Sequence, residues 1–250
     1  MRILIWNMQG GSPGGSLAKH ESAWRYLRER DPDVALLQEA TVPAWAEERW
    51  GSVIHEARRR GSKARGWGSA VIAKDEGFER FVPGEETPWL DRFRGGVVLA
   101  RAPWNQWFAS VHVSAQAERL SPDDAAGVAL CAPPKVWEVD LVTHDLGHFF
   151  EGRRFVAGGD LNASLAFDSR TRQGNARLFD NLRALGVNDL RAPFFDEEQR
   201  TFYGRGQRIL QLDHVFGDPV TREAATSWRV LTEPAEELGL SDHAPIEVEL

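Results

Sequence analysis

The sequence predicts one domain of mixed α and β structure, in which two packed β-sheets are flanked by helices. Short apolar runs typical of strands recur along all 250 residues, and helical patterns stand between only some of them. No internal repeat, low-complexity block or linker divides the chain. A hydrophobic content of 42% is enough for one large core. We therefore expect a single domain over residues 1–250, although a division into two domains is also allowed.

The first half of the chain is expected to begin with a strand over residues 2–6, which is rich in Ile and Leu. Ser16 is placed to cap a helix that runs to about Arg30. Pro32 ends this helix, because proline lacks an amide donor and restricts the residue before it. Five more strands are expected in this half, at about 34–38, 52–57, 69–73, 97–101 and 107–113.

The second half alternates between predicted helices and strands. The segment that begins at Ala132, "APPKVWEVDLVTHDLGHFFEG", has helical apolar spacing after its prolines. A strand over 154–159 follows, and then a helix over about 175–185 that ends at Gly186. The last strands are expected at about 212–216, 228–231 and 245–249.

Composition and charge exclude several classes of protein. The formal net charge of -7 and the pI of about 5.6 rule out a global basic field for nucleic-acid binding, although a local basic patch remains allowed. Cys131 is the single cysteine, so no disulfide can form within the chain, and a cytoplasmic location is expected. The first residues, "MRILIWNM", are typical of a strand and not of a signal peptide. No segment approaches the ~18 apolar residues of a membrane span.

Polar side chains stand at or near the ends of six of the predicted strand segments. Any one of them could be an ordinary turn residue or a structural histidine. Turn chemistry does not predict the recurrence, whereas strand ends that converge on one rim would gather these groups into a single cleft. The residues concerned are Asn7, Glu39, His112, Asp160, Asn162, Asp213, Asp242 and His243.

The motifs around these residues resemble those of the endonuclease/exonuclease/phosphatase superfamily, also called the DNase I-like fold. They are "WNMQ", "LLQEA", "SVHVSA", "GGDLNAS", "LDHVF" and "LSDHAP", and they run in order from residue 7 to residue 245. The resemblance implies a four-layer α/β/β/α sandwich of two mixed sheets between helices. It also implies hydrolysis of phosphoesters with the help of Mg²⁺ or Mn²⁺.

The resemblance implies a role for each of these side chains. By its position among the family's motifs Glu39 would be the main metal ligand, and Asn7 and Asp242 would assist it. This sparse set is adequate because Mg²⁺ prefers oxygen ligands and keeps several waters. Asp160 would activate the attacking water, and Asn162, expected on the same side of an extended chain, would donate to a phosphoryl oxygen. The remaining catalytic residues would be His243, oriented by Asp213, and His112, which would contact the phosphate or help the leaving group.

Two features beside these motifs are interpreted structurally or sterically. His214 follows Asp213 in a strand, so it is expected to point to the opposite face and to be structural. Gly158 and Gly159 are expected to leave room for the substrate to approach the backbone.

The substrate is expected to be DNA or RNA, and basic segments near the motifs favour this. "RRRGSKARGWG" would supply phosphate contacts and a stacking ring, unless it is only a solvated hairpin tip. The proposed contacts are Arg58, Arg59, Arg60, Lys63, Arg65 and Trp67, with Arg101 from a second basic set. The "NMQGG" and "QEATV" segments and the absence of a tyrosine in "VHVSA" argue against an abasic-site enzyme. The alternatives are a phosphatase or phosphodiesterase that acts on a small molecule or lipid head group, and an inactive binding protein.

Overall fold

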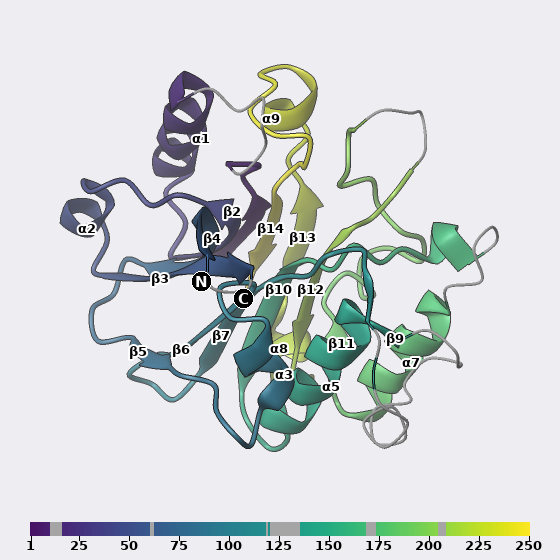
Figure 1. The fold of residues 1–250 in the computed structure, drawn as a ribbon. Coiled ribbons are helices and arrows are strands. Elements are labelled where there is room, and N and C mark those ends of the chain that lie inside the picture. The colour runs from purple at the N-terminus through teal and green to yellow at the C-terminus, as the bar shows by residue number, and fades with distance from the viewer. Residues whose placement is uncertain (11–16, 61–62, 119, 121–135, 169–173, 205–208) are drawn as a thin grey trace.

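Two six-stranded β-sheets pack face to face in the computed structural model, which describes residues 1–10, 17–60, 63–118, 120, 136–168, 174–204 and 209–250 (Figure 1). The first sheet has the order β13 (Ser227–Val230), β14 (Ile246–Glu249), β1 (Arg2–Asn7), β2 (Val34–Ala40), β4 (Lys63–Ala73) and β3 (Ser52–Arg60). The second has the order β11 (Asn188–Asp189), β12 (Asp213–Gly217), β10 (Phe155–Asp160), β7 (Trp107–His112), β6 (Val97–Arg101) and β5 (Glu79–Phe81).

Both sheets are mixed, because each has one parallel pair in a mostly antiparallel ladder. β1 runs parallel to β2, and β10 runs parallel to β7. The carboxyl ends of these parallel strands therefore meet at one edge of their sheet. A separate two-stranded ladder joins β8 (Ala117–Glu118) to β9 (Val136–Trp137).

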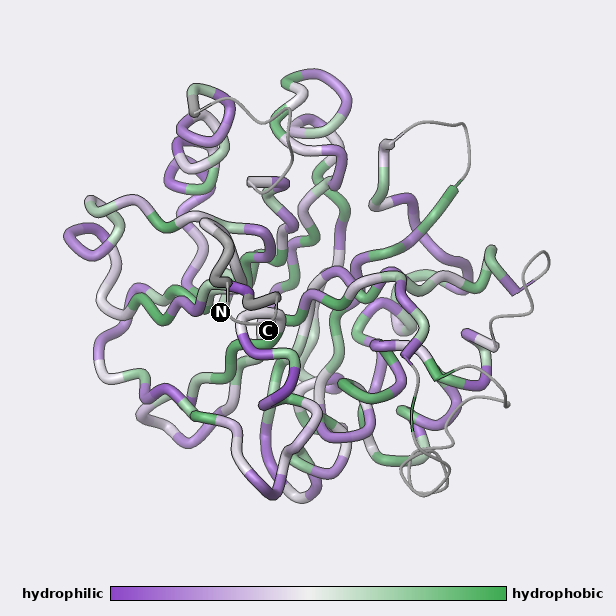
Figure 2. Tube along the Cα trace, viewed as in Figure 1, coloured by the Kyte–Doolittle hydropathy of each residue, from purple (hydrophilic) through white to green (hydrophobic). Residues whose placement is uncertain are grey.

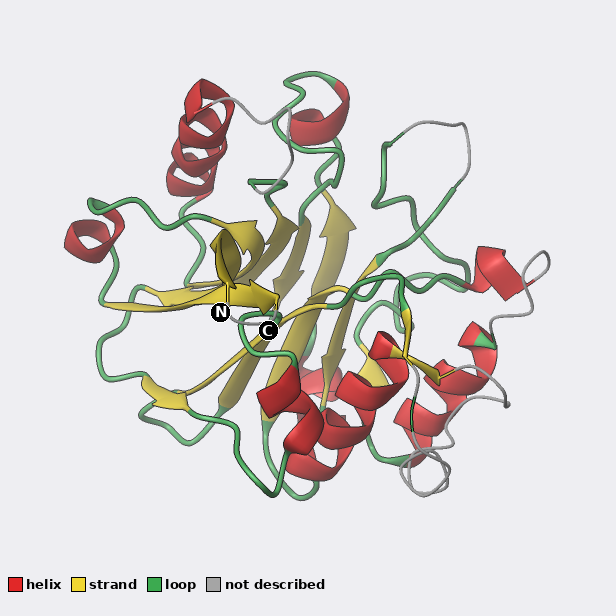
Figure 3. Ribbon diagram, in the orientation of Figure 1, coloured by secondary structure: helices red, strands yellow, loops and turns green. Residues whose placement is uncertain are grey.

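Helices cover the outer faces of the two sheets (Figure 3). On the first sheet, Trp24 and Leu27 of α1 (Leu17–Arg30) pack against Leu4 and Trp6 of β1. On the second sheet, the apolar sides of α5 (Glu138–Phe150) and α7 (Asn175–Ala184) pack against the outer face of β7, β10 and β12. The shorter helices are α2 (Ala46–Arg49), α3 (Pro88–Arg92), η1 (Leu165–Phe167), α8 (Pro219–Ala224) and α9 (Glu233–Glu236).

Besides the two apolar cores between each sheet and its helices, a third core lies between the two sheets. It explains why the central strands are apolar on both faces. Ile3, Ile5, Phe108, Val156 and Val215 meet there, all at most 2% exposed. Hydrophobic residues accordingly line the central strands, whereas the peripheral helices mix hydrophilic and hydrophobic residues (Figure 2). The predicted fold class, two mixed sheets between helices, is confirmed.

The predicted strands and helices in the described ranges are present. Most of their ends shift by only one or a few residues, but β4, expected over 69–73, already begins at Lys63. The helix expected after the prolines of the 132–152 segment begins at Glu138, where Asp140, the third helical residue, accepts a hydrogen bond from the Trp137 amide with its Oδ2 (2.7 Å). Ser16 lies outside the described residues. In the ranges that the structure describes, no helix has the length and apolar character needed to cross a membrane.

Gly159 allows close approach of the neighbouring strand β7 and of Gln38 in the opposite sheet, and the expectation that Gly158 and Gly159 make room for substrate is wrong. A Cβ atom on Gly159 would lie 1.9 Å from the carbonyl oxygen of Val111 and 2.9 Å from Cδ of Gln38. A Cβ atom on Gly158 would lie 3.0 Å from Cγ1 of Ile5. Gly159 also has a φ of +148°, which side chains disfavour. The space on these glycines is therefore already filled, by the neighbouring strand β7 of the same sheet and by Gln38 and Ile5 of the opposite sheet.

Candidate active site

Strand alternation turns four of the predicted polar residues into the space between the sheets. Successive residues of a strand point to opposite faces. Ile3 and Ile5 of β1 face the inner core, so Asn7 at the end of the strand faces the same way. The same alternation places His112 with Phe108, Asp160 with Val156, and Asp213 with Val215.

The strand registers place three of these residues side by side. Asp160 of β10 pairs with His112 of β7 on one side and with Asp213 of β12 on the other. Asn7 reaches across from the first sheet, and its Nδ2 donates to Asp160 Oδ2 at 3.0 Å. The cluster thus joins both sheets at one edge of the sandwich.

Glu39 enters the cluster because the backbone of β2 leaves the strand conformation. Gln38 faces the inner core, so regular alternation would turn Glu39 outward, towards α1. Glu39 instead has a φ of 48°, and the register of β2 shifts between Leu37 and Ala40. Its Oε1 lies 3.5 Å from His112 Nε2. Burial raises the pKa of Glu39, whereas a hydrogen bond with Asn7 lowers it.

His243 is brought to the cluster by a loop that is tied to the end of β1. Ser241 Oγ donates to the carbonyl oxygen of Asn7 (2.7 Å) and accepts from the amide of His243 (3.1 Å). Trp6 Nε1 donates to the carbonyl oxygen of His243 (3.0 Å). The loop before β14 is therefore held against β1 on both sides of Asp242.

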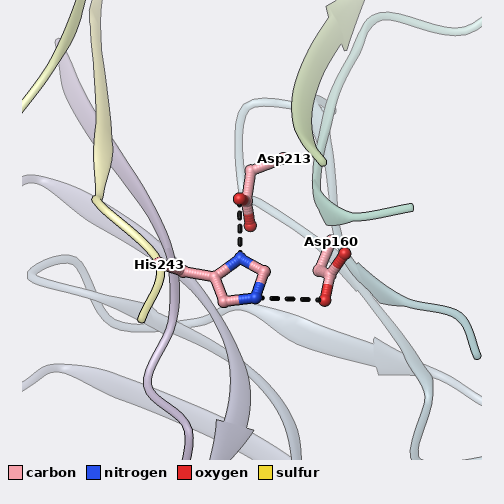
Figure 4. Close-up of side chains that lie close together, drawn as sticks. All are labelled: Asp160, Asp213 and His243. Atoms are coloured by element: carbon pink, nitrogen blue, oxygen red, sulfur yellow. Dashed lines mark hydrogen bonds and ion pairs between the residues drawn. The ribbon is translucent and has the colours of Figure 1, made fainter. Parts of the chain in front are cut away.

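The His243 ring lies between two carboxylates (Figure 4). Its Nδ1 is 2.8 Å from Asp213 Oδ2, and its Nε2 is 3.8 Å from Asp160 Oδ2. Burial alone would lower the pKa of His243, but Asp213 and then Asp160 raise it to about 10. The ring is therefore an imidazolium at neutral pH. This is the direction expected if the Asp213 carboxylate raises the affinity of His243 for a proton.

Asp160 is the most perturbed acid of the cluster. It is 2% exposed, and burial raises its pKa to about 7, although the charge of His243 opposes the increase. A carboxyl group with this pKa changes its protonation near neutral pH, which suits a general base.

Asn162 holds Asp160 and does not lie in an extended chain, so that part of the prediction is wrong. β10 ends at Asp160, and Asn162 has a φ of 48°. Its amide N donates to Asp160 Oδ1 (2.9 Å), and its Nδ2 donates to Asp160 Oδ2 (3.2 Å) and to the carbonyl oxygen of Val113 (2.9 Å).

The predicted substrate residues separate into three groups. Trp67 lies beside the cluster, with its ring centroid 5.6 Å from that of His112. Arg58 is also there, but its side chain is 11% exposed and forms an ion pair with Glu138. The structure does not bring Arg101 to the cluster, because it lies at the opposite end of β6 and pairs with Glu79 (2.8 Å). The other predicted side chains lie outside the described part of the structure: Arg59, Arg60, Lys63 and Arg65.

The prediction that His214 is structural agrees with its surroundings. Its Nε2 lies 2.9 Å from the carbonyl oxygen of Ala163, and its ring packs between Phe179 and Phe216, on the opposite face of β12 from Asp213.

Two sets of side chains could hold a divalent cation. Asp160, Asp213 and His243 offer ligand atoms within 4.8 Å of one another, but a metal-bound imidazole must be neutral, and the high pKa of His243 opposes this. Glu39 and Asp242 offer carboxylates whose side chains are 20% and 32% exposed. Mg²⁺ and Mn²⁺ prefer oxygen ligands and Mg²⁺ retains waters, so this partly open pair fits such an ion better.

Several buried polar residues support the cluster although the sequence predicted no role for them. Gln38 is fully buried and its Nε2 donates to Ser110 Oγ (2.9 Å), which links β2 to β7 across the inner core. Ser241 ties the His243 loop to β1. A polar residue at an inner position of a buried strand was the available signal for Gln38 and Ser110, whereas nothing in the sequence marked Ser241.

Comparison with known proteins agrees with this architecture. A model of the endonuclease/exonuclease/phosphatase family matches residues 4–243. No curated protein matches the chain. Three similar solved structures each align over 100% of this chain and 99% of their own. Two are of NExo: the 3' phosphatase from Neisseria bound to a product DNA hairpin (21% identity, TM-score 0.71) and the 3'-5' exonuclease from Neisseria meningitidis (22% identity, TM-score 0.71). The third is an AP endonuclease from Archaeoglobus fulgidus (17% identity, TM-score 0.70). At these identities the likeness establishes a common fold.

Proposed function

The chain belongs to the endonuclease/exonuclease/phosphatase family, and on that premise we propose that it is a metal-dependent phosphoester hydrolase that cleaves phosphodiester bonds in DNA or RNA. One observation carries the proposal: Asp160, buried and with a pKa near 7, lies between the imidazolium of His243 and the amides of Asn7 and Asn162. This arrangement provides a base for water beside a positive charge for phosphate.

Each described side chain has a part in the proposed reaction. Asp160 accepts a proton from the water whose oxygen attacks phosphorus, and the ester P–O bond on the opposite side breaks. His243, held protonated by Asp213, offsets the negative charge that develops on the phosphoryl oxygens. His112 directs Nε2 towards the same space and donates to a phosphoryl or leaving oxygen. Asn7 and Asn162 keep the Asp160 carboxylate in place.

Mg²⁺ or Mn²⁺ would be held by Glu39 and Asp242, with assistance from Asn7. When bound, the cation supplies positive charge that weakens the repulsion between the phosphate and its nucleophile. The oxygen donors and their partial exposure support this choice of ion.

A nucleic-acid substrate is supported by the position of the hairpin between β3 and β4. Arg58 and Trp67, on its two strands, both contact His112, so the hairpin begins beside the cluster. Four more basic residues belong to the hairpin sequence, and basic residues beside a hydrolytic site suit a phosphate backbone. The structural neighbours named for DNA products and nuclease activity agree with this choice.

A panel of substrates tests the proposal. We would incubate the protein with Mg²⁺ or Mn²⁺ and with plasmid, single-stranded DNA, RNA, or generic phosphate mono- and diesters. We expect cleavage of at least one nucleic acid, and its loss in EDTA. Turnover of a small ester with no cut nucleic acid would replace the nuclease by a small-molecule phosphatase or phosphodiesterase. No turnover of any ester would favour a binding protein.

A further inference from the structure

Arg58 is bound on all sides by the residues around His112. Its Nη1 donates to the carbonyl oxygen of His112 (2.8 Å) and lies 3.3 Å from the ring Nδ1 of the same residue. Its Nη2 donates to Ser114 Oγ (3.0 Å) and to Glu138 Oε1 (2.5 Å). Each of the two terminal nitrogens carries two hydrogens, so these four contacts occupy the whole end of the guanidinium.

The surrounding backbone leaves just enough space for this contact. A Cβ atom on Gly96 would lie 2.8 Å from Arg58 Nη1 and 2.8 Å from the carbonyl oxygen of His112. Gly95, with a φ of +76°, passes so close to β3 that a Cβ atom there would lie 2.5 Å from Cα of Arg58. Trp67 packs against the His112 ring at 5.6 Å between centroids.

A guanidinium can only donate hydrogen bonds, so the contact with Arg58 determines which ring nitrogen of His112 carries the hydrogen. Nδ1 of His112 must act as the acceptor towards Arg58, so the hydrogen of the neutral ring is on Nε2. Nε2 in turn lies 3.5 Å from Glu39 Oε1 and 3.9 Å from Asp160 Oδ2. Arg58 thereby orients a hydrogen-bond donor towards the space where the phosphate is expected.

We propose that Arg58 is a positioning residue that holds the imidazole of His112 with Nε2–H directed at the reaction centre, and that it makes no contact with the substrate. The inference rests on the proposed function, and it reassigns a residue whose sequence context indicated a phosphate contact. The side chain is 11% exposed, and its partner Glu138 is 4% exposed, so neither the solvent nor a nucleic-acid backbone competes for the guanidinium.

The test compares Arg58→Lys with Arg58→Met, using the nucleic acid that is cut in the substrate panel. Lysine keeps the ion pair with Glu138 but lacks the planar fork, so it cannot hold His112, Ser114 and Glu138 at once. We expect Arg58→Lys to regain stability relative to Arg58→Met, while kcat in both variants remains about 10- to 100-fold below wild type. KM and the salt dependence of KM should stay unchanged.

A matched control separates positioning from stability. Arg30→Met removes an arginine paired with a buried carboxylate, Glu247 (2.9 Å), on the α1 side of the first sheet. We expect this variant to lose stability and retain kcat. If Arg58→Met does not fold, Arg58→Met combined with Glu138→Gln removes the unpaired buried charge and takes its place.

Four outcomes would overturn the proposal. A phosphate contact would raise KM and lower the salt slope by about one. A purely structural role would make kcat follow the melting temperature across all variants, and full activity of Arg58→Lys would show that the fork is not needed. Crystal structures of wild type and Arg58→Lys test the inference even if no ester is turned over, since an unmoved His112 ring would contradict it.

Discussion

Replacing Asp160 by Asn should abolish activity and at the same time stabilise the protein at alkaline pH. The loss of the base should lower kcat by about 10²- to 10⁴-fold. The stability effect follows from the pKa of Asp160, which burial raises from the ordinary value of 3.8 to about 7. At 1.36 kcal/mol per pKa unit, ionising this carboxyl inside the fold costs about 4 kcal/mol at pH 8.

Asparagine removes that cost but mismatches one hydrogen bond. An asparagine can keep its oxygen at the Oδ2 position, which accepts from Asn7 and Asn162, but its NH₂ group then faces the Asn162 backbone amide that now donates to Oδ1 (2.9 Å), at a cost of about 1–3 kcal/mol. The net gain at pH 8 is therefore about 1–3 kcal/mol, or a few degrees in Tm. Because a raised carboxyl pKa removes stability as pH rises from the unfolded towards the folded value, the gain should almost vanish at pH 5.

The assay is thermal and urea unfolding of both proteins in EDTA at pH 5 and pH 8, together with turnover in Mg²⁺. Asp180→Asn is the control, because that side chain is 67% exposed and should change neither quantity. An Asp160→Asn protein that is less stable than wild type at pH 8 would contradict the raised pKa of Asp160, and one that keeps its activity would contradict its role as the base.

Three other substitutions test the remaining parts of the site. Asp213→Asn removes the carboxylate that opposes the effect of burial, so the pKa of His243 should fall. The alkaline limb of the profile of kcat/KM against pH should then move to lower pH, and an unmoved limb would argue against an imidazolium at His243. Glu39→Gln should raise the Mg²⁺ concentration needed for half-maximal activity by about tenfold or more, as a metal titration would reveal, and an unchanged requirement would move the ion elsewhere. Gly159→Ala should destabilise the fold by about 2 kcal/mol or more, because its Cβ atom would meet the Val111 carbonyl. Gly84→Ala is the control, because open space surrounds Gly84, and urea unfolding measures the stability of both variants.

The pattern of the sequence indicated mixed α and β structure with two packed sheets, and its resemblance to the motifs of a known family supplied the four-layer order and much of the candidate site. Short apolar runs marked the strands, and the polar residues at their ends marked the edge where Asn7, His112, Asp160 and Asp213 meet. This worked because alternation is a local property of an extended chain, so a residue two or four positions from a buried one faces the same way.

The position of Glu39 and the partners of Arg58 depend on the tertiary structure and do not follow from strand alternation. Glu39 reaches the cluster only through a positive φ and a register shift in β2, and regular alternation would have turned it towards α1. The basic segment was interpreted as a set of phosphate contacts, yet Arg58 is committed to His112 and Glu138, which are 54 and 80 residues away in the chain.

The glycines of "GGDLNAS" illustrate the same division. The local sequence shows that a buried strand ends on an acid and that small residues precede it. The tertiary structure shows that the Val111 carbonyl of the neighbouring strand β7 and Gln38 of the opposite sheet fill the space above Gly159. Local pattern determines which way a side chain faces, but its partners depend on which distant strands come together, and that is settled by the free energy of the whole packed core.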